Sequence, residues 1–184
     1  MLKEKYQNLV IPKMRELFGY KNNLVTPRII KVVINTGIGK ILGNLDPSKR
    51  EPIIQGVLND LALISGQKPI LTRAKKAISG FKTRKNSIVG AKITLRKNRA
   101  YEFLERLINV VLPRSRDFRG ISFKTVDKRG NLTIGIGEHI VFPEIQPEKA
   151  KVAFGLEVTI VTNAKSKEEA IQFFKLMGFP LKER

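Results

Sequence analysis

The densest group of chemically active side chains in this sequence is a run of lysines and arginines in residues 61–101. The run holds eleven Lys or Arg and no Asp or Glu, whereas the whole chain has 35 basic and 16 acidic residues. More than half of the formal net charge of +19 therefore falls in these 41 residues. Charge of one sign at this density repels itself and attracts polyanions, whereas a surface charged only for solubility mixes both signs.

In the centre of the run, cationic side chains alternate with small and aromatic residues. Lys and Arg neutralise phosphates, Gly lets a backbone approach a ligand, and Phe stacks on bases or riboses. The alternative is a solvated basic loop with Phe81 turned into the core, but the charge of the whole chain favours nucleic acid. The residues expected to contact it are Arg73, Lys75, Lys76, Ser79, Gly80, Phe81, Lys82, Arg84 and Lys85.

A second group of arginines lies in the sequence PRSRDFRG, residues 113–120. Arg114, Arg116 and Arg119 surround Asp117. Arg suits planar, bidentate recognition of phosphate better than Lys does, so these residues are candidates for further RNA contacts. Asp117 could instead pair with a neighbouring Arg and brace the loop, and both interpretations can hold together.

The glycines of residues 37–43 follow a predicted strand, which invites comparison with a dinucleotide-binding loop. In such a loop the helix opens among the glycines, whereas here the helix-start signals Asp46-Pro47 and Glu51-Pro52 come later. The spacing also differs from the common GxGxxG. We therefore interpret residues 37–43 as a tight turn of unusual backbone angles.

Catalytic chemistry of the common kinds finds little support. There is no Cys, which excludes thiol catalysis, disulfides and zinc ribbons, and His139 is the only histidine. A serine triad would need His139 as its base, and no motif marks a Ser or Asp as its partner. Glu138 and Glu144 are isolated carboxylates. The sequence predicts a protein that is not an enzyme, with a structural His139, no cofactor and no metal.

Apolar periodicity predicts the elements that position these residues. Their order predicts an α+β fold in which helices pack on one face of a mainly antiparallel five-stranded sheet, with a long basic loop at about 72–88 between two strands. The length fits one domain, 1–184. The sequence has no run of 18 apolar residues, so we expect no transmembrane helix and no membrane partner. The first helix is expected at 2–19, with an interruption at Pro12, and the second starts between Pro47 and Pro52 and ends at 65. The third runs from a cap at Asn98 to Pro113, and the fourth from a Ser166–Glu169 capping box to 177. Strands are expected at 28–35, 68–71, 90–96, 132–137 and 156–160.

The strand at 90–96 has one apolar and one polar face. Ala91, Ile93 and Leu95 point to one side, and Lys92, Thr94 and Arg96 to the other. In the strand at 28–35, Ile30, Val32 and Ile34 share one face and Asn35 lies on the other. If helices cover only the apolar face, the polar face is free to lie on RNA.

Several longer motifs occur in one order along the chain: VVINTGIGK, ISGQKPILTRAKKAISGFK, VGAKITLR, EFLERLI, PRSRDFRG, HIVFPEI and GLEVTIVTNAKS. Together they span nearly the whole sequence. With these motifs the chain resembles the bacterial-type large-subunit ribosomal proteins of the L-five family, the 5S rRNA binders of the central protuberance. One departure is Lys97, where the family usually has Gly.

The resemblance implies a structural constituent of the large ribosomal subunit. Members bind 5S rRNA with the exposed sheet face, link it to 23S rRNA, and contact neighbouring large-subunit proteins and a small-subunit head protein. Their basic loop, here residues 73–85, reaches peptidyl-site tRNA. The implied ribosome is cytoplasmic and bacterial, or organellar. Rival interpretations are a free-standing RNA-binding or chaperone-like factor and a nucleotide-dependent enzyme using residues 37–43. The 5S rRNA positions would be Asn35, Gln67, Thr94 and Arg96, with Lys92 on the same predicted face.

Overall fold

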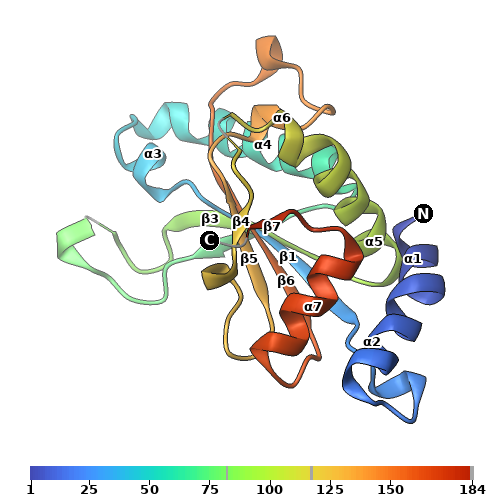
Figure 1. Cartoon of the computed structure of the whole chain (residues 1–184). Coiled ribbons are helices and arrows are strands. Elements are labelled where there is room, and N and C mark those ends of the chain that lie inside the picture. Colours follow the sequence, from blue (N-terminus) through green and yellow to red (C-terminus); the bar gives the residue numbers. More distant parts are fainter. Residues whose placement is uncertain (82, 117, 183–184) are drawn as a thin grey trace. The chain divides into compact units, whose positions relative to one another are not determined.

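A computed structural model describes residues 1–81, 83–116 and 118–182 of the chain (Figure 1). It has the predicted α+β fold, with an antiparallel five-stranded sheet in the order β2-β3-β1-β6-β5. Along β5 and β6, and along β3 from Ala91 onward, every second residue is buried, as the alternation predicted. The strands of this sheet are β1 (Ile29–Gly37), β2 (Ile70–Arg73), β3 (Ile88–Leu95), β5 (Leu132–Ile136) and β6 (Leu156–Thr162).

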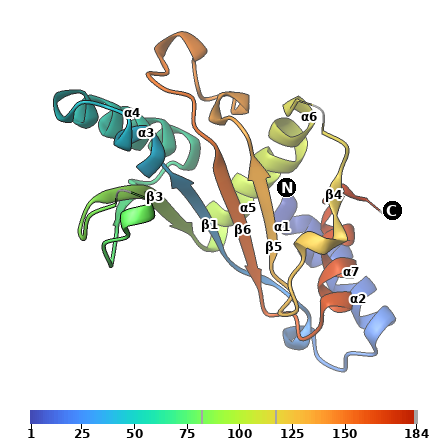
Figure 2. The same cartoon turned by 90° about the vertical axis from the view of Figure 1, so that its left-hand side faces the viewer.

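The chain forms two compact units. Unit 1 consists of Met1–Val32, Leu95–Ile134 and Thr159–Arg184, and unit 2 of Val33–Thr94 and Gly135–Val158. The boundaries between the units fall within β1, β3, β5 and β6. Figure 2 shows β1, β6 and β5 running side by side, in agreement with the strand order.

Unit 1 is built on helices that pack through aromatic and aliphatic side chains. The ring of Tyr6 contacts Phe173 edge-on at 6.2 Å between centroids, and Phe103 and Leu107 are almost completely buried. Burial of this apolar surface is the main favourable contribution to the stability of the unit. The helices are α1 (Leu2–Lys5), α2 (Ile11–Phe18), α5 (Lys97–Arg106), α6 (Leu112–Arg114) and α7 (Lys167–Met177).

Two prolines lie within helical runs of unit 1, and only Pro12 departs from its prediction. Pro12, the predicted break of the first helix, lies inside a continuous helical run, whereas the third run ends at Arg114, one residue after its predicted end at Pro113. Each follows a wider π-helical turn, Tyr6–Val10 before Pro12 and Leu107–Val111 before Pro113. Proline lacks the N–H donor and clashes with the carbonyl one turn back, and the wider turn accommodates both defects.

The start of α5 also differs from the prediction. Asn98 does not cap the helix, because Arg96 occupies the N-cap position and Asn98 instead accepts a hydrogen bond from Lys3 Nζ at 3.0 Å. Lys97 adopts φ +52°, the left-handed conformation that favours glycine. At α7, by contrast, the predicted cap is present, since Ser166 Oγ accepts the Glu169 N–H. The Glu169 carboxylate accepts the N–H of Lys165 rather than that of the cap residue.

Unit 2 contains the long helix α4 (Pro47–Ser65), which starts in the predicted window and ends at Gly66 with φ +65°. Its buried stripe includes Ile54, Val57, Leu61 and Ile64. Residues 37–43 do not form the expected turn of unusual angles. They contain the short helix α3 (Gly39–Gly43), and none of their glycines has a positive φ.

Two further details were not anticipated. Ile30 is 39% exposed, although Val32 and Ile34 of the same strand are buried. The predicted buried face of β1 therefore does not include Ile30, and Ile29 is buried in its place. In unit 1, the two-residue strands β4 (Ile121–Ser122) and β7 (Leu181–Lys182) pair in parallel. Elements this short carry no detectable alternation. Short 3-10 turns occur at Asn23–Val25, Ser79–Phe81, Phe123–Thr125, His139–Val141 and Pro147–Lys149.

Candidate nucleic-acid interface

In unit 2 the exposed face of the sheet carries polar side chains over a closed apolar face. On β3, Ala91 and Ile93 are buried, whereas Lys92 is exposed and Thr94 is half-buried. On the neighbouring strand β1, Asn35 is exposed. The predicted register of β3 is therefore confirmed, and cationic, hydroxyl and amide groups share an accessible surface.

Gln67 is fixed by contacts that connect the end of α4 to β3. Its side-chain Nε2 donates to the carbonyl oxygen of Thr94 at 3.3 Å. Its backbone N–H donates to Ser65 Oγ at 3.2 Å, and this hydroxyl donates to the carbonyl oxygen of Leu61 at 2.7 Å. The structure thus brings together Gln67 and Thr94, which are 27 residues apart. Arg96 follows β3 and is exposed.

Glycines make up four of the eight residues that line a shallow hollow of about 390 Å³ on unit 2, which no motif in the sequence indicated. Thr36 Oγ1 donates to the Gly155 carbonyl oxygen at 2.7 Å and holds one wall in place. Glycine presents bare backbone, so a phosphodiester chain can approach closely. The alternation of Gly135 and Gly137 with apolar residues was the available signal. The hollow is lined by Asn35, Gly37, Gly135, Ile136, Gly137, Gly155, Leu156 and Glu157.

The basic loop between β2 and β3 forms an extended arm, described for residues 74–81 and 83–87 and drawn in green at the left of Figure 1. Backbone hydrogen bonds organise it. The Ala74 N–H donates to the Ser87 carbonyl oxygen at 2.9 Å, and Ile78 and Thr83 form an antiparallel bridge with bonds of 3.0 and 3.1 Å. Ile78 is half exposed, so the arm owes little to core packing.

The predicted cations of this segment are mostly accessible. Arg73 is exposed, and its guanidinium donates to the Asn86 carbonyl oxygen at 3.1 Å, bracing the base of the arm. Lys82 and the side chain of Phe81 lie outside the described residues. The other predicted contact residues, all exposed, are Lys75, Lys76, Ser79, Gly80, Arg84 and Lys85.

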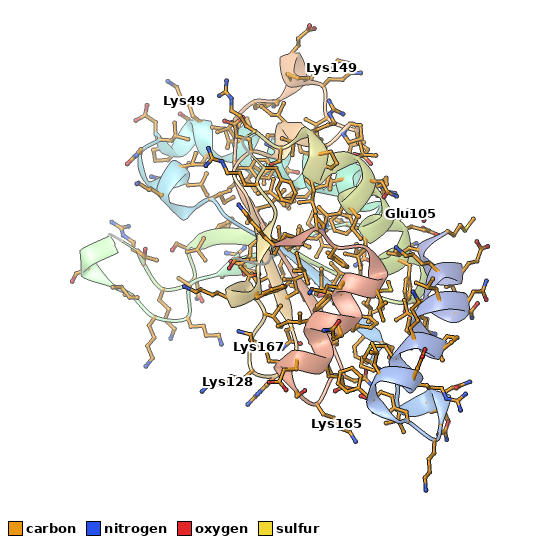
Figure 3. All side chains as sticks on the ribbon, in the orientation of Figure 1. Lys49, Glu105, Lys128, Lys149, Lys165 and Lys167 are labelled. Carbon is orange, nitrogen blue, oxygen red and sulfur yellow. The ribbon has the colours of Figure 1, made fainter. Side chains whose placement is uncertain are left out.

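Unit 1 presents two separate groups of basic residues. Arg114, Arg116 and Arg119 are exposed at and after α6, and Asp117, the expected partner of one of them, lies outside the described residues. The second group was not predicted. Lys128 and Arg129 belong to the turn before β5, Lys165 lies just before α7 and Lys167 is its first residue; Figure 3 shows Lys128, Lys165 and Lys167 at one end of the unit. The Thr162 hydroxyl, bonded to the Gly130 carbonyl oxygen at 2.7 Å, joins the two segments.

His139 is buried in unit 2 and is positioned for a structural role. Its Nε2 lies 3.3 Å from Asp60 Oδ2 on α4, its Nδ1 accepts the Phe154 N–H at 3.4 Å, and its ring stacks on Phe154 at 3.9 Å. Burial lowers the pKa of His139, and the Asp60 carboxylate opposes this shift. Asp60 is a partner that no sequence motif indicated. With the imidazole completely buried, the pair links the turn at His139–Val141 to α4.

Other chemistry is sparse in the part of the chain that the structure describes. No group of three or more His, Cys, Asp or Glu side chains could hold a metal ion there. Among the same residues, no helix is both long and apolar enough to cross a membrane.

Comparison with known proteins gives a consistent match. Residues 22–84 match the family model described as ribosomal protein L5, and residues 88–181 match the model of the C-terminus of the same ribosomal family. The large ribosomal subunit protein uL5 of Halothermothrix orenii is 50% identical over 184 residues, 100% of this chain and 99% of its own. Those of Carboxydothermus hydrogenoformans and Clostridium acetobutylicum are each 48% identical over 179 residues, covering 97% of this chain and 97% and 96% of their own. The chain therefore belongs to the ribosomal protein L5 family and is a structural component of the large subunit of a bacterial ribosome, not an enzyme.

Proposed function

We propose that this protein binds 5S rRNA through the polar sheet face of unit 2. The observation that carries the proposal is the accessible row of Asn35, Lys92 and Thr94 beside the glycine-lined hollow. Hydroxyl, amide and cationic groups contact phosphate and the ribose 2′-hydroxyl, and bare backbone lets a shallow RNA groove come near. Gln67, bonded to Thr94, extends this surface, and Arg96, which follows β3 in unit 1, is a further 5S rRNA contact.

The remaining basic groups contact other RNA. Arg114, Arg116 and Arg119 contact rRNA, and the protein links 5S rRNA to 23S rRNA in the central protuberance. The arm, which presents exposed Lys75, Lys76, Arg84 and Lys85, contacts peptidyl-site tRNA. Neighbouring large-subunit proteins and a small-subunit head protein complete the set of partners. The relatives named above come from bacteria, so the setting is the cytoplasmic ribosome.

The sheet face is tested by binding of purified variants to 5S rRNA, measured by filter retention at fixed salt. Thr94→Val and Arg96→Ala should each weaken binding while circular dichroism stays unchanged. Loss of a charge-assisted bond to phosphate corresponds to about a tenfold loss of affinity. Lys149→Ala is the matched control for Arg96→Ala, because it removes the same charge from an exposed turn away from β3.

Ile93→Asp tests the opposite face of β3. Ile93 is 2% exposed, so the substitution buries a carboxylate and should unfold the protein. Equal losses of binding in Arg96→Ala and Lys149→Ala would show that net charge alone determines affinity, and the proposal would then be wrong.

A further inference from the structure

A hollow of about 610 Å³ in unit 2 lies between α3, the start of α4 and the base of the arm. We propose that it binds one nucleoside phosphate unit, with the phosphate on three arginines and the base on an apolar wall. The unit is either a single unstacked nucleotide of an RNA chain or a free mononucleotide. This site is separate from the polar sheet face and from the tip of the arm.

The arginines come from three segments of the chain and converge on the hollow: Arg50 from α4, Arg73 from the end of β2 and Arg84 from the arm. Among the described residues that line it there is no carboxylate. Three guanidinium groups facing one space repel one another, and an anion in that space removes the repulsion. Arg also matches the planar, bidentate geometry of phosphate oxygens.

Two of these arginines are already oriented by the protein. Arg50 is half-buried, and its Nε donates to the Leu45 carbonyl oxygen at 3.0 Å, while Arg73 donates to Asn86 at 3.1 Å. A guanidinium carries five N–H donors, so one carbonyl bond leaves donors for a ligand. Side chains held in place in advance lose less entropy when a ligand binds.

The rest of the lining suits the non-ionic part of a nucleotide. Leu42 and Ile54 are buried and, with Pro47 and Ile88, form an apolar wall against which a base can pack. Gly39 and Gly43 contribute bare backbone from α3. The Ile38 N–H donates to the Val89 carbonyl oxygen at 3.0 Å and fixes α3 against β3. The volume falls within the range of about 300–1,000 Å³ that is usual for small-ligand pockets.

The test is a titration of the full-length protein with AMP, adenosine and hexauridylate, followed by the NMR shifts of the Gly39, Gly43 and Val89 amides. AMP should shift these amides, and adenosine should not do so at the same concentration, because the phosphate supplies the charge-assisted bonds. Assigning the nucleotide to an RNA chain rests on the proposed function. In that case hexauridylate shifts the same amides at lower concentration than AMP, and a response to AMP alone overturns this assignment.

Matched variants separate the hollow from general charge. Arg50→Gln should raise the dissociation constant of AMP about tenfold, whereas Lys49→Gln should change it by less than about twofold. Lys49 precedes Arg50 on α4, is 71% exposed and does not line the hollow. Arg84→Gln, which lines the hollow, and Lys85→Gln, which does not, form a second matched pair. The same difference in AMP affinity is expected within this pair, which provides the test if Arg50→Gln does not fold.

Equal losses within both pairs, or an equal response to adenosine and AMP, would overturn the site. Neither result affects the sheet-face proposal, because that proposal is tested by the binding of Thr94→Val and Arg96→Ala to 5S rRNA and not by AMP. Conversely, loss of the sheet-face proposal leaves the AMP titration valid.

Discussion

Replacing Gly90 by alanine should destabilise the protein far more than its single added methyl group suggests. Gly90 lies in β3 between its neighbours β2 and β1. A Cβ at this position would meet the carbonyl oxygen of Thr36 at 2.2 Å and Thr72 Oγ1 at 2.9 Å. Carbon–oxygen contacts in sheets are about 3.3 Å or longer, so the Thr36 backbone would have to move by about 1 Å.

The surroundings of Thr36 leave little room for this movement. Thr36 is 2% exposed, and its hydroxyl donates to the Gly155 carbonyl oxygen at 2.7 Å. Overpacking costs about 1–3 kcal/mol and loss of the hydrogen bond about 1 kcal/mol, whereas the reduced entropy of the unfolded chain returns about 0.4–1 kcal/mol. We expect a net loss of about 2–3 kcal/mol, a large part of the roughly 5–15 kcal/mol that is typical of folded domains.

Urea unfolding followed by circular dichroism measures this loss from the midpoint and slope of the transition. Gly135→Ala is the control, because a Cβ there meets nothing within 4 Å and φ is not positive. It should stay within about 0.5 kcal/mol of the parent protein. If Gly90→Ala unfolds at the same urea concentration as Gly135→Ala, the tight approach of β1 to β3 does not limit stability and the reasoning fails.

Four further outcomes are expected. Affinity for 5S rRNA should fall steeply with salt, by a slope of roughly 0.9 per phosphate contacted if duplex DNA is a guide, and a flat salt dependence would contradict phosphate recognition. Replacing Lys75 and Lys76 together with Ala should change stability by less than about 0.5 kcal/mol and leave 5S rRNA binding largely intact, but speed tRNA dissociation from ribosomes carrying the variant; the reverse pattern would assign the arm to 5S rRNA. Lys97→Gly should raise the free energy of unfolding by about 0.5–1 kcal/mol, since it relieves a left-handed φ of +52° at some entropic cost, and thermal melts that show destabilisation would refute this. Because burial lowers the pKa of His139 below its ordinary 6.5, its stabilising contribution is complete above that pH and is lost as the pH falls through the lower folded-state pKa. Urea midpoints above and below pH 6.5 should therefore differ more in the parent protein than in His139→Gln.

Much of the fold and part of the site were predictable because they depend on local periodicity. The alternation of Ala91, Ile93 and Leu95 with Lys92 and Thr94 was enough to assign the two faces of β3, since successive side chains of a strand point to opposite sides. Pro47 and Gly66 indicated the two ends of helix α4. The charge density indicated a polyanionic partner without any knowledge of the fold, because the amino-acid composition alone determines the charge density.

Tertiary structure decided what depends on neighbours distant in the sequence. Pro12 was expected to break a helix, but a π-helical turn accommodates it, because packing of the apolar face outweighs a local defect. The burial of His139 against Asp60, separated by 79 positions in the chain, left no sequence signal. The same is true of the hollow where Arg50, Arg73 and Arg84 converge. Single residue types predict what a segment can bind, whereas only the folding of separate segments onto one another determines which of them meet.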